Sequence, residues 1–276
     1  MATHSVTLAD FTMPGGFDPE AIETTTRKFG AAVLPQFVTG AALPALQREF
    51  SAVLEDNDEA YVYKLTYPAG RAASLTNNET FKKKYKAIAE LFDRYDLVSF
   101  AHRYIGTPCL PNQEIYATHE RVPDSPVAPT HFDKLWNLKF MFYVDDVGQG
   151  NAPFGIVPGS AVANREAFRR IFEDNQLTSL SMSDSRYQGM SNSRSPEQDE
   201  EVVEITAPAG TLIVFDTDTS HRARPVEAGK ERRILRGHSG PYAKYERVKK
   251  YSRQWWRGEK AYSKIDEIKD KVLMRA

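Results

Sequence analysis

The chain has 276 residues, of which 41% are hydrophobic and 11% aromatic, enough to bury one large core in a single domain. Lys and Arg number 36 against 37 Asp and Glu, a formal net charge of −1, which argues against the basic footprint of a protein that binds nucleic acid or an anionic membrane. We therefore expect a small-molecule partner. Composition leaves open whether the chain forms a homodimer. Cys109 is the single cysteine, so an intramolecular disulfide and a thiolate zinc cluster are excluded. With neither a leader-like opening nor a long apolar run, we expect a cytoplasmic protein.

The first part of the chain, residues 1–96, is predicted to be rich in helices. Apolar residues recur at helical spacing from Asp18 to Lys28 and from Ala41 to Leu54. A short β-prone piece, Ala31 to Pro35, separates these two helices. A third helix is predicted from Glu79 to Arg94, where large apolar side chains again follow each other at intervals of three and four. We treat this part as belonging to one domain that spans residues 1–276.

Residues 97–242 are predicted to form a β-rich core. Short β-prone runs, separated by Pro, Gly and Asp turns with few helices between them, are typical of an antiparallel sandwich or barrel. The runs are Leu97 to Ile105, Glu114 to His119, Leu138 to Val144, Gly155 to Val157, Val202 to Thr206, Thr211 to Phe215, and Arg233 to Arg236. We also predict a turn at Pro158-Gly159-Ser160 and one helix from Ala163 to Glu173.

Two further segments allow alternative interpretations. Residues 175–200 are polar and lack apolar periodicity, so they predict either a lid over a site or a disordered insertion. Residues 243–276 mix Lys and Arg with Tyr and Trp. We favour C-terminal helices that pack their aromatic rings inward. The less favoured alternative is a basic aromatic stripe that binds nucleic acid.

The triplet His131-Phe132-Asp133, followed later by His221, is the most informative motif. Residues i and i+2 of an extended segment share a face, so His131 and Asp133 can reach one metal while Phe132 points away. Two imidazoles and one carboxylate form the facial triad of non-haem iron oxygenases. Such a triplet also arises by chance, but His221 follows a β-prone run. Arg232 then opens another apolar run and offers a forked guanidinium for a dicarboxylate.

At this point the sequence resembles a known family. The run from Thr130 to Asp146 and the following Gly150 to Ser160 are similar to the core of the phytanoyl-CoA dioxygenase family of iron(II)/2-oxoglutarate oxygenases. The resemblance covers roughly residues 97–242. It implies a double-stranded β-helix, the jelly-roll or cupin-like core, with flanking helices. Many members continue the Pro-Gly-Ser with a histidine, where this chain has Ala161.

The same resemblance implies the chemistry of the site. His131, Asp133 and His221 would be the catalytic iron(II) ligands, and Arg232 would bind the C5 carboxylate of 2-oxoglutarate, with O2 as the second co-substrate. Related halogenases replace the acidic ligand by a small residue, so the presence of Asp133 disfavours halogenation. Arg233, the neighbour of Arg232, would face the other side of the strand and is the alternative carboxylate ligand.

Other residues are open between a role in the site and a role in the core. Lys139 and Tyr116 are expected to contact 2-oxoglutarate or substrate, but each could equally be core or rim. The same alternatives apply to Tyr104, Trp136, His102 and His238. His119, on a neighbouring predicted strand, is either a rival metal ligand or a histidine of the sheet. Arg121, Arg222, Arg224 and Arg236 favour an anionic or zwitterionic ligand, although surface solvation is the commoner role of arginine.

We therefore expect an iron(II)/2-oxoglutarate-dependent dioxygenase that hydroxylates a C–H bond of a small polar substrate and releases succinate and CO2. Amino-acid-derived compounds and secondary metabolites are candidate substrates. Desaturation, cyclisation or epimerisation remain open. The alternatives are a non-catalytic, metal-binding cupin-like protein and an iron oxygenase that does not use 2-oxoglutarate.

Overall fold

The computed structural model describes residues 5–106, 109–125, 130–133, 138–166 and 201–241. The predicted loop at 175–200, the predicted helices in 243–276 and Trp136 lie outside these residues. None of the helices in the described ranges is long and apolar enough to cross a lipid bilayer.

Five α-helices precede most of the strands, after a short 3-10 helix at Leu8–Phe11. They are α1 (Pro19–Phe29), α2 (Ala42–Glu55), α3 (Glu79–Lys84), α4 (Lys86–Phe92) and α5 (Tyr95–Ile105). The Asp18 side chain caps α1 by accepting from two backbone N–H groups of its first turn. Gly30 ends α1 at φ 90°, and a Cβ there would lie 2.1 Å from Oγ1 of Thr219. This contact ties α1 to the loop that leads to His221.

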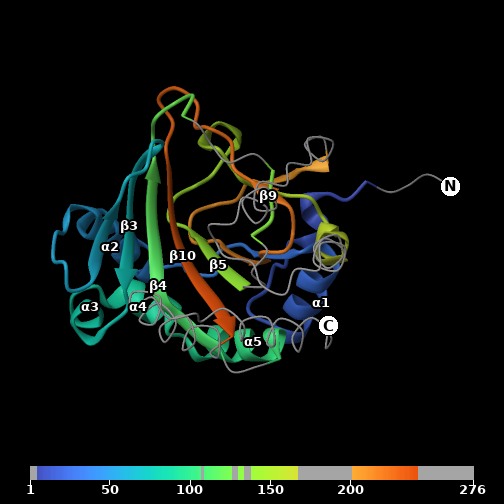
Figure 1. Ribbon diagram of the computed structural model, residues 1–276, viewed down its shortest axis with the longest axis horizontal. Helices are drawn as coiled ribbons and strands as arrows, with labels where there is room; N and C mark the ends of the chain where they lie inside the picture. The colour runs from blue at the N-terminus through green and yellow to red at the C-terminus, as the bar shows by residue number, and fades with distance from the viewer. Residues whose placement is uncertain (1–4, 107–108, 126–129, 134–137, 167–200, 242–276) are drawn as a thin grey trace, which may run out of the picture.

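Seven strands form one antiparallel sheet in the order β1-β8-β5-β10-β4-β3-β2. Its strands are β1 (Ala31–Leu34), β2 (Val62–Leu65), β3 (Gly70–Thr76), β4 (Cys109–Glu120), β5 (Leu138–Tyr143), β8 (Leu212–Asp216) and β10 (Arg232–Pro241). The two longest, β4 and β10, run side by side through the centre of Figure 1. A second, three-stranded sheet has the order β7-β6-β9 and contains β7 (Val203–Ile205), β6 (Phe154–Ile156) and β9 (His221–Arg222).

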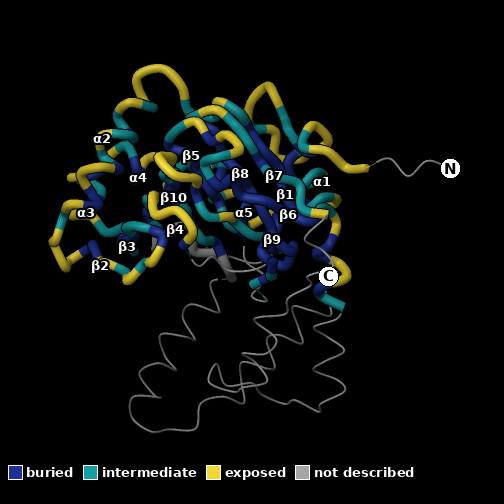
Figure 2. The backbone as a smooth tube through the Cα atoms, turned by 90° about the horizontal axis from the view of Figure 1, so that it is seen from above, coloured by how far each residue is buried: buried dark blue, intermediate teal, exposed yellow. Residues whose placement is uncertain are grey.

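The large sheet has two differently covered faces, because side chains alternate along each strand. The outer face packs against the helices through one apolar cluster that includes Phe50, Phe140 and Leu235. The inner face packs against the three-stranded sheet through a second cluster that includes Met141 and Phe215. Figure 2 shows the buried strands at the centre of the molecule and exposed loops at its rim. Two facing antiparallel sheets with flanking helices confirm the predicted fold class.

The structure corrects the sequence analysis at several elements. Residues 97–105 were predicted as a strand, but they lie in α5, which buries Leu97, Phe100, Ala101 and Tyr104 at helical intervals. A short apolar run has the same composition in a buried strand and in a buried helix, so periodicity alone does not separate them.

The predicted helix from Glu79 to Arg94 is two helices that meet at Tyr85. The strands β2 and β3 were missed, so residues 1–96 contribute three strands to the large sheet in addition to helices. The predicted turn at Pro158–Ser160 is confirmed, with Gly159 at φ 79°. Residues 160–166 are helical, and the rest of the predicted 163–173 helix lies outside the described residues.

Candidate metal centre

Backbone pairing brings the two halves of the predicted triad together. His131 and His221 form an isolated antiparallel bridge: His131 N donates to His221 O at 3.0 Å, and His221 N donates to His131 O at 2.7 Å. Asp133 N donates to Thr217 O at 2.8 Å. Phe132, between the two ligands, is buried. The triad therefore rests on main-chain hydrogen bonds between segments that are far apart in the sequence.

The three side chains converge at one point. Oδ1 of Asp133 lies 3.6 Å from Nε2 of His131 and 3.8 Å from Nε2 of His221, and one ligand atom from each residue lies within 4.8 Å of the others. Adjacent ligands of an octahedral metal, bonded at about 2.1 Å, are separated by about 3 Å. A small contraction would therefore place all three atoms on one face of a divalent ion. The donor set and its spacing fit an iron(II) site.

The environment of His221 prepares its Nε2 for a metal. Nδ1 lies 2.8 Å from the carbonyl oxygen of Thr219, which can only accept, so Nδ1 carries the proton and Nε2 has the free lone pair. Burial lowers the pKa of the His221 imidazole to about 3 and outweighs the opposing effect of the Asp133 carboxylate. The rings of Phe154 and Phe215 lie 5.6 and 5.3 Å from the imidazole. The imidazole is therefore neutral and held between rings.

Lys139, on the inner face of β5, orients the acidic ligand. Its Nζ donates to Oδ2 of Asp133, while Oδ1 faces the two histidines. Burial acts to raise the pKa of the Asp133 carboxyl, but the charge of the Lys139 ammonium and its hydrogen bond outweigh burial and hold that pKa below its usual range. The carboxylate is therefore ionised, with one oxygen committed to lysine and the other directed at the metal position.

Arg232 and Arg233 lie on opposite faces of β10, as strand alternation requires. Arg232 is buried, donates from Nη1 to the Ala152 carbonyl and from Nη2 to Glu120, and has no partner for Nε among the described residues. Arg233 faces the helices, where it pairs with Asp145 and lies over the Phe50 ring. Arg232 is thus the member of the pair on the same side of the sheet as the triad.

Several other candidates lie away from the metal position. His119, on β4, pairs with Glu231 at 2.8 Å and contacts Phe50 on the outer face. Tyr104, in α5, donates to Asp216 at 2.8 Å. His102 lies in the last turn of α5. These three side chains belong to the helix-covered half of the molecule.

Tyr116 and His238 do lie on the inner face, where their rings stack with centroids 4.8 Å apart. Whether Lys139 and Tyr116 contact 2-oxoglutarate stays a prediction. The sequence analysis missed the roles of Glu120 and Tyr67, whose hydroxyl donates to Glu120. Side chains alternate along β4, so Glu120 shares a face with Tyr116, and this spacing in the sequence could have indicated that Glu120 lies on the side of the site.

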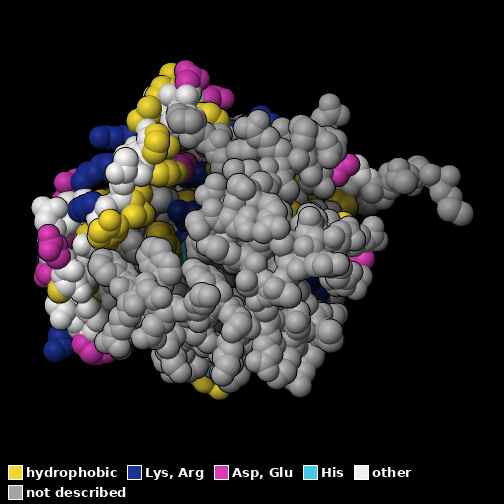
Figure 3. All heavy atoms as spheres, in the orientation of Figure 1, with side chains coloured by type: hydrophobic (Ala, Val, Ile, Leu, Met, Phe, Trp, Pro, Cys, Tyr) yellow, Lys and Arg dark blue, Asp and Glu magenta, His cyan; other side chains and the backbone are white. Residues whose placement is uncertain are grey.

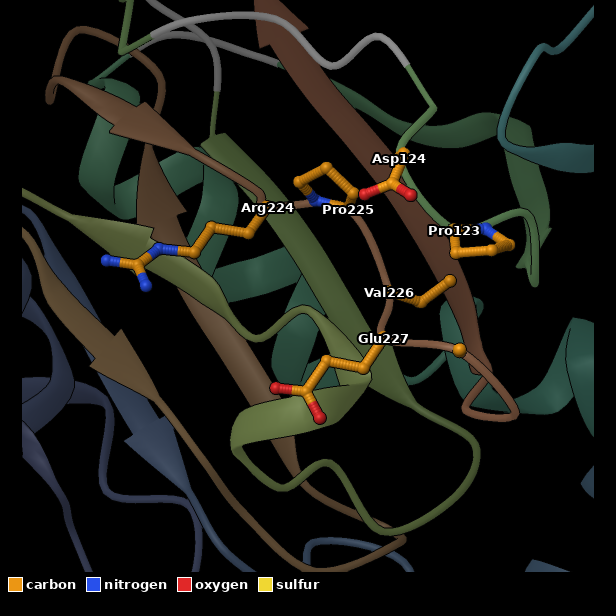
Figure 4. A pocket seen from close by; sticks show the side chains of 7 residues that line it. Pro123, Asp124, Arg224, Pro225, Val226 and Glu227 are labelled. Atoms are coloured by element: carbon orange, nitrogen blue, oxygen red, sulfur yellow. The ribbon is translucent and has the colours of Figure 1, made fainter.

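A surface cavity of about 460 Å³ is a separate feature. It is lined by Pro123, Asp124, Arg224, Pro225, Val226, Glu227 and Ala228, and no triad residue reaches it (Figure 4). In the space-filling view, Lys and Arg side chains as well as Asp and Glu side chains reach the surface in the described part of the chain (Figure 3).

Solved structures share this fold. The epimerase SnoN, in complex with Fe3+, alpha ketoglutarate and nogalamycin RO, superposes with a TM-score of 0.58 at 14% identity, over 81% of this chain and 83% of SnoN. The non-heme alpha ketoglutarate dependent carbocyclase SnoK gives 0.58 at 15% identity, over 82% and 87%. HygX from Streptomyces hygroscopicus, with nickel, 2-oxoglutarate and hygromycin B bound, gives 0.52 at 13% identity, over 80% and 86%. The chain therefore shares the double-stranded β-helix fold of these structures.

A model of the phytanoyl-CoA dioxygenase family matches residues 26–234. The chain belongs to that family. The match includes the triad and Arg232. A comparison with curated proteins found no match.

Proposed function

We propose that the protein is an iron(II)/2-oxoglutarate-dependent oxygenase that hydroxylates a C–H bond of a small polar organic substrate. The observation that carries the proposal is the convergence of His131, Asp133 and His221, with the buried Arg232 on the same side of the sheet. Three protein ligands on one face leave coordination positions for a chelating co-substrate and O2. A metal site with a purely structural role would have no use for a dicarboxylate-binding arginine.

The three ligands would hold iron(II), which together with 2-oxoglutarate and O2 supplies the oxidant for the C–H bond and releases succinate and CO2. The chain's own contribution is geometric. Thr219 holds the His221 ring in the tautomer that binds metal, and Lys139 holds Oδ2 of Asp133 so that Oδ1 faces the ion. The buried rings of Phe154 and Phe215 limit water on the side of His221.

Arg232 would bind the C5 carboxylate of 2-oxoglutarate. A guanidinium has five N–H donors, and the two protein contacts of Arg232 leave Nε without a partner among the described residues. The Glu120 and Ala152 contacts fix the guanidinium plane, so little rotamer freedom is lost when the carboxylate binds. The pairing of Arg233 with Asp145 on the helix-covered face supports the choice of Arg232 over Arg233.

Related structures support a small organic substrate but leave several outcomes for the substrate. SnoN is described as an epimerase and SnoK as a carbocyclase, whereas the HygX complex contains hygromycin B. We place hydroxylation first because it does not require the protein to steer the oxidised substrate into another reaction. Epimerisation and cyclisation each require such steering by the protein.

Anaerobic addition of iron(II) and 2-oxoglutarate tests the proposal. We expect a weak visible charge-transfer band in the wild-type protein and its absence in His131→Ala, with succinate formed once O2 is admitted. A band without succinate, across a broad substrate panel, would favour the non-catalytic binding protein. O2 consumption without a band would favour an iron oxygenase that does not use 2-oxoglutarate.

A further inference from the structure

Arg236 lies on the inner face of β10, between Arg232 and the triad. It pairs across the sheet with Tyr116 of β4 and Met141 of β5, and His238, two residues further along β10, lies opposite Lys139. At about 3.4 Å per residue, Arg236 is roughly 7 Å along the strand from the Lys139 level and roughly 14 Å from Arg232. It is therefore the arginine of β10 nearer to Asp133, the residue that Lys139 contacts.

The Arg236 guanidinium has no ion-pair or hydrogen-bond partner among the described residues. Its Nε is buried without an acceptor, although the residue as a whole is partly exposed. Arg232 and Arg233 differ in this respect, because each is paired with a carboxylate. A buried hydrogen-bond donor without a partner lowers the stability of the fold. Binding of a ligand to that donor is a physical reason for its presence.

The described charged side chains on this side of the sheet have a net charge of one positive unit. Lys139 is balanced by Asp133, and Arg232 by Glu120, while Arg236 is unbalanced. Iron(II) and the 2-oxoglutarate dianion of the proposed function balance each other. The site would therefore be neutral when it takes one further anionic group at Arg236.

We infer that Arg236 is the binding residue for a carboxylate, or a like singly charged anionic group, of the organic substrate. The inference rests on the proposed function and narrows its substrate class to anionic or zwitterionic compounds. The Tyr116 ring, 5.9 Å from the guanidinium carbon and stacked on His238, forms one wall beside the anion position. Arg232 and the metal account for the two ends of 2-oxoglutarate, so the anion at Arg236 comes from the substrate.

The test compares Arg236→Gln and Arg236→Lys with wild type and with Arg48→Gln, which removes a charge from an exposed residue of α2. The probes are small monocarboxylates and their primary amides, for example phenylacetate and phenylacetamide, added anaerobically to the protein with iron(II) and 2-oxoglutarate. In wild type and Arg48→Gln, we expect acids to shift the charge-transfer band at concentrations about 30-fold below those of amides. Arg236→Gln should remove the preference, and Arg236→Lys should keep part of it.

Titration with 2-oxoglutarate separates the two sources of carboxylate. We expect the 2-oxoglutarate requirement of Arg236→Gln to stay within about threefold of wild type, on the order of 0.6 kcal/mol. A rise of 30-fold or more would assign Arg236 to the co-substrate and overturn the inference, as would equal response of wild type to acids and amides. Absence of the band in wild type would instead refute the proposed function.

Thermal unfolding of the metal-free protein gives a readout that does not need turnover. Because Arg236 has no ion-pair or hydrogen-bond partner in the described part of the chain, Arg236→Gln should melt at or above the wild-type temperature. Phenylacetate should raise the melting temperature of wild type but not of Arg236→Gln. A clear fall in melting temperature in Arg236→Gln would show that the arginine is paired within the fold, against the inference.

Discussion

Replacing Arg232 by Met should lower both the stability of the protein and its affinity for 2-oxoglutarate, and Glu120 allows the two losses to be separated. The Arg232 side chain is 3% exposed and the Glu120 side chain 8%. Removal of one partner therefore leaves an uncompensated charge in the interior. The hydroxyl of Tyr67, which donates to Glu120, offsets only part of that cost.

Breaking a buried ion pair from one side typically costs about 3–5 kcal/mol in the free energy of unfolding, whereas replacing both partners costs much less. The whole protein has on the order of 5–15 kcal/mol of stability. Arg232→Met should thus remain folded but be marginal. Adding Glu120→Gln should restore more than half of the loss, because a neutral amide can still accept from Tyr67.

The affinity for 2-oxoglutarate should not recover in the double variant. Loss of the guanidinium leaves the C5 carboxylate unpaired, at a cost of about 2–5 kcal/mol, or roughly 30-fold or more in dissociation constant. Urea unfolding measures the first quantity, and anaerobic titration of the charge-transfer band measures the second. Recovery of both stability and affinity in the double variant would show that Arg232 has a structural role alone. A larger affinity loss in Arg233→Met would also refute the assignment.

Three further predictions concern the ligands and the pH dependence of stability. His131→Ala or His221→Ala should abolish iron binding and succinate formation while the circular dichroism spectrum stays native, and wild-type iron content in either variant would disprove the triad. Lys139→Met, which frees Oδ2 of Asp133, should weaken iron(II) binding by about 10–100-fold in a chelator competition; unchanged binding would remove its orienting role. Burial acts to raise the pKa of Asp56, but hydrogen bonds from two tyrosines and a lysine hold it below its usual range. The ionised Asp56 carboxylate therefore stabilises the folded protein above the unfolded pKa of about 3.9, and this stabilisation is lost as pH falls below that value. Asp56→Asn should lower the free energy of unfolding in urea by about 2 kcal/mol at pH 7 and by less at pH 3. An equal cost at both pH values would contradict this.

Local patterns in the sequence were sufficient for the elements whose signals are local. The helices α1 and α2 follow from apolar residues at helical spacing, and the strands of the core from short β-prone runs between turns. The triad was predictable for the same reason, since the i, i+2 spacing of His131 and Asp133 and the position of His221 after a β-prone run are visible in one dimension. The motif also carried the resemblance that the family match confirms.

The tertiary structure decided what depends on pairing between distant segments. Whether residues 97–105 form a strand or a helix was settled by packing against the outer face of the sheet. The finding that Arg232 and not Arg233 lies on the side of the triad depends on the two faces of β10. The partners Glu120 of Arg232 and Lys139 of Asp133 depend on strand register and on the bridge at His131. The local sequence pattern indicates which face of a strand a residue occupies, but not which residue lies opposite on the neighbouring strand. The opposite residue is determined by the fold of lowest free energy, to which burial and hydrogen bonding along the whole chain contribute.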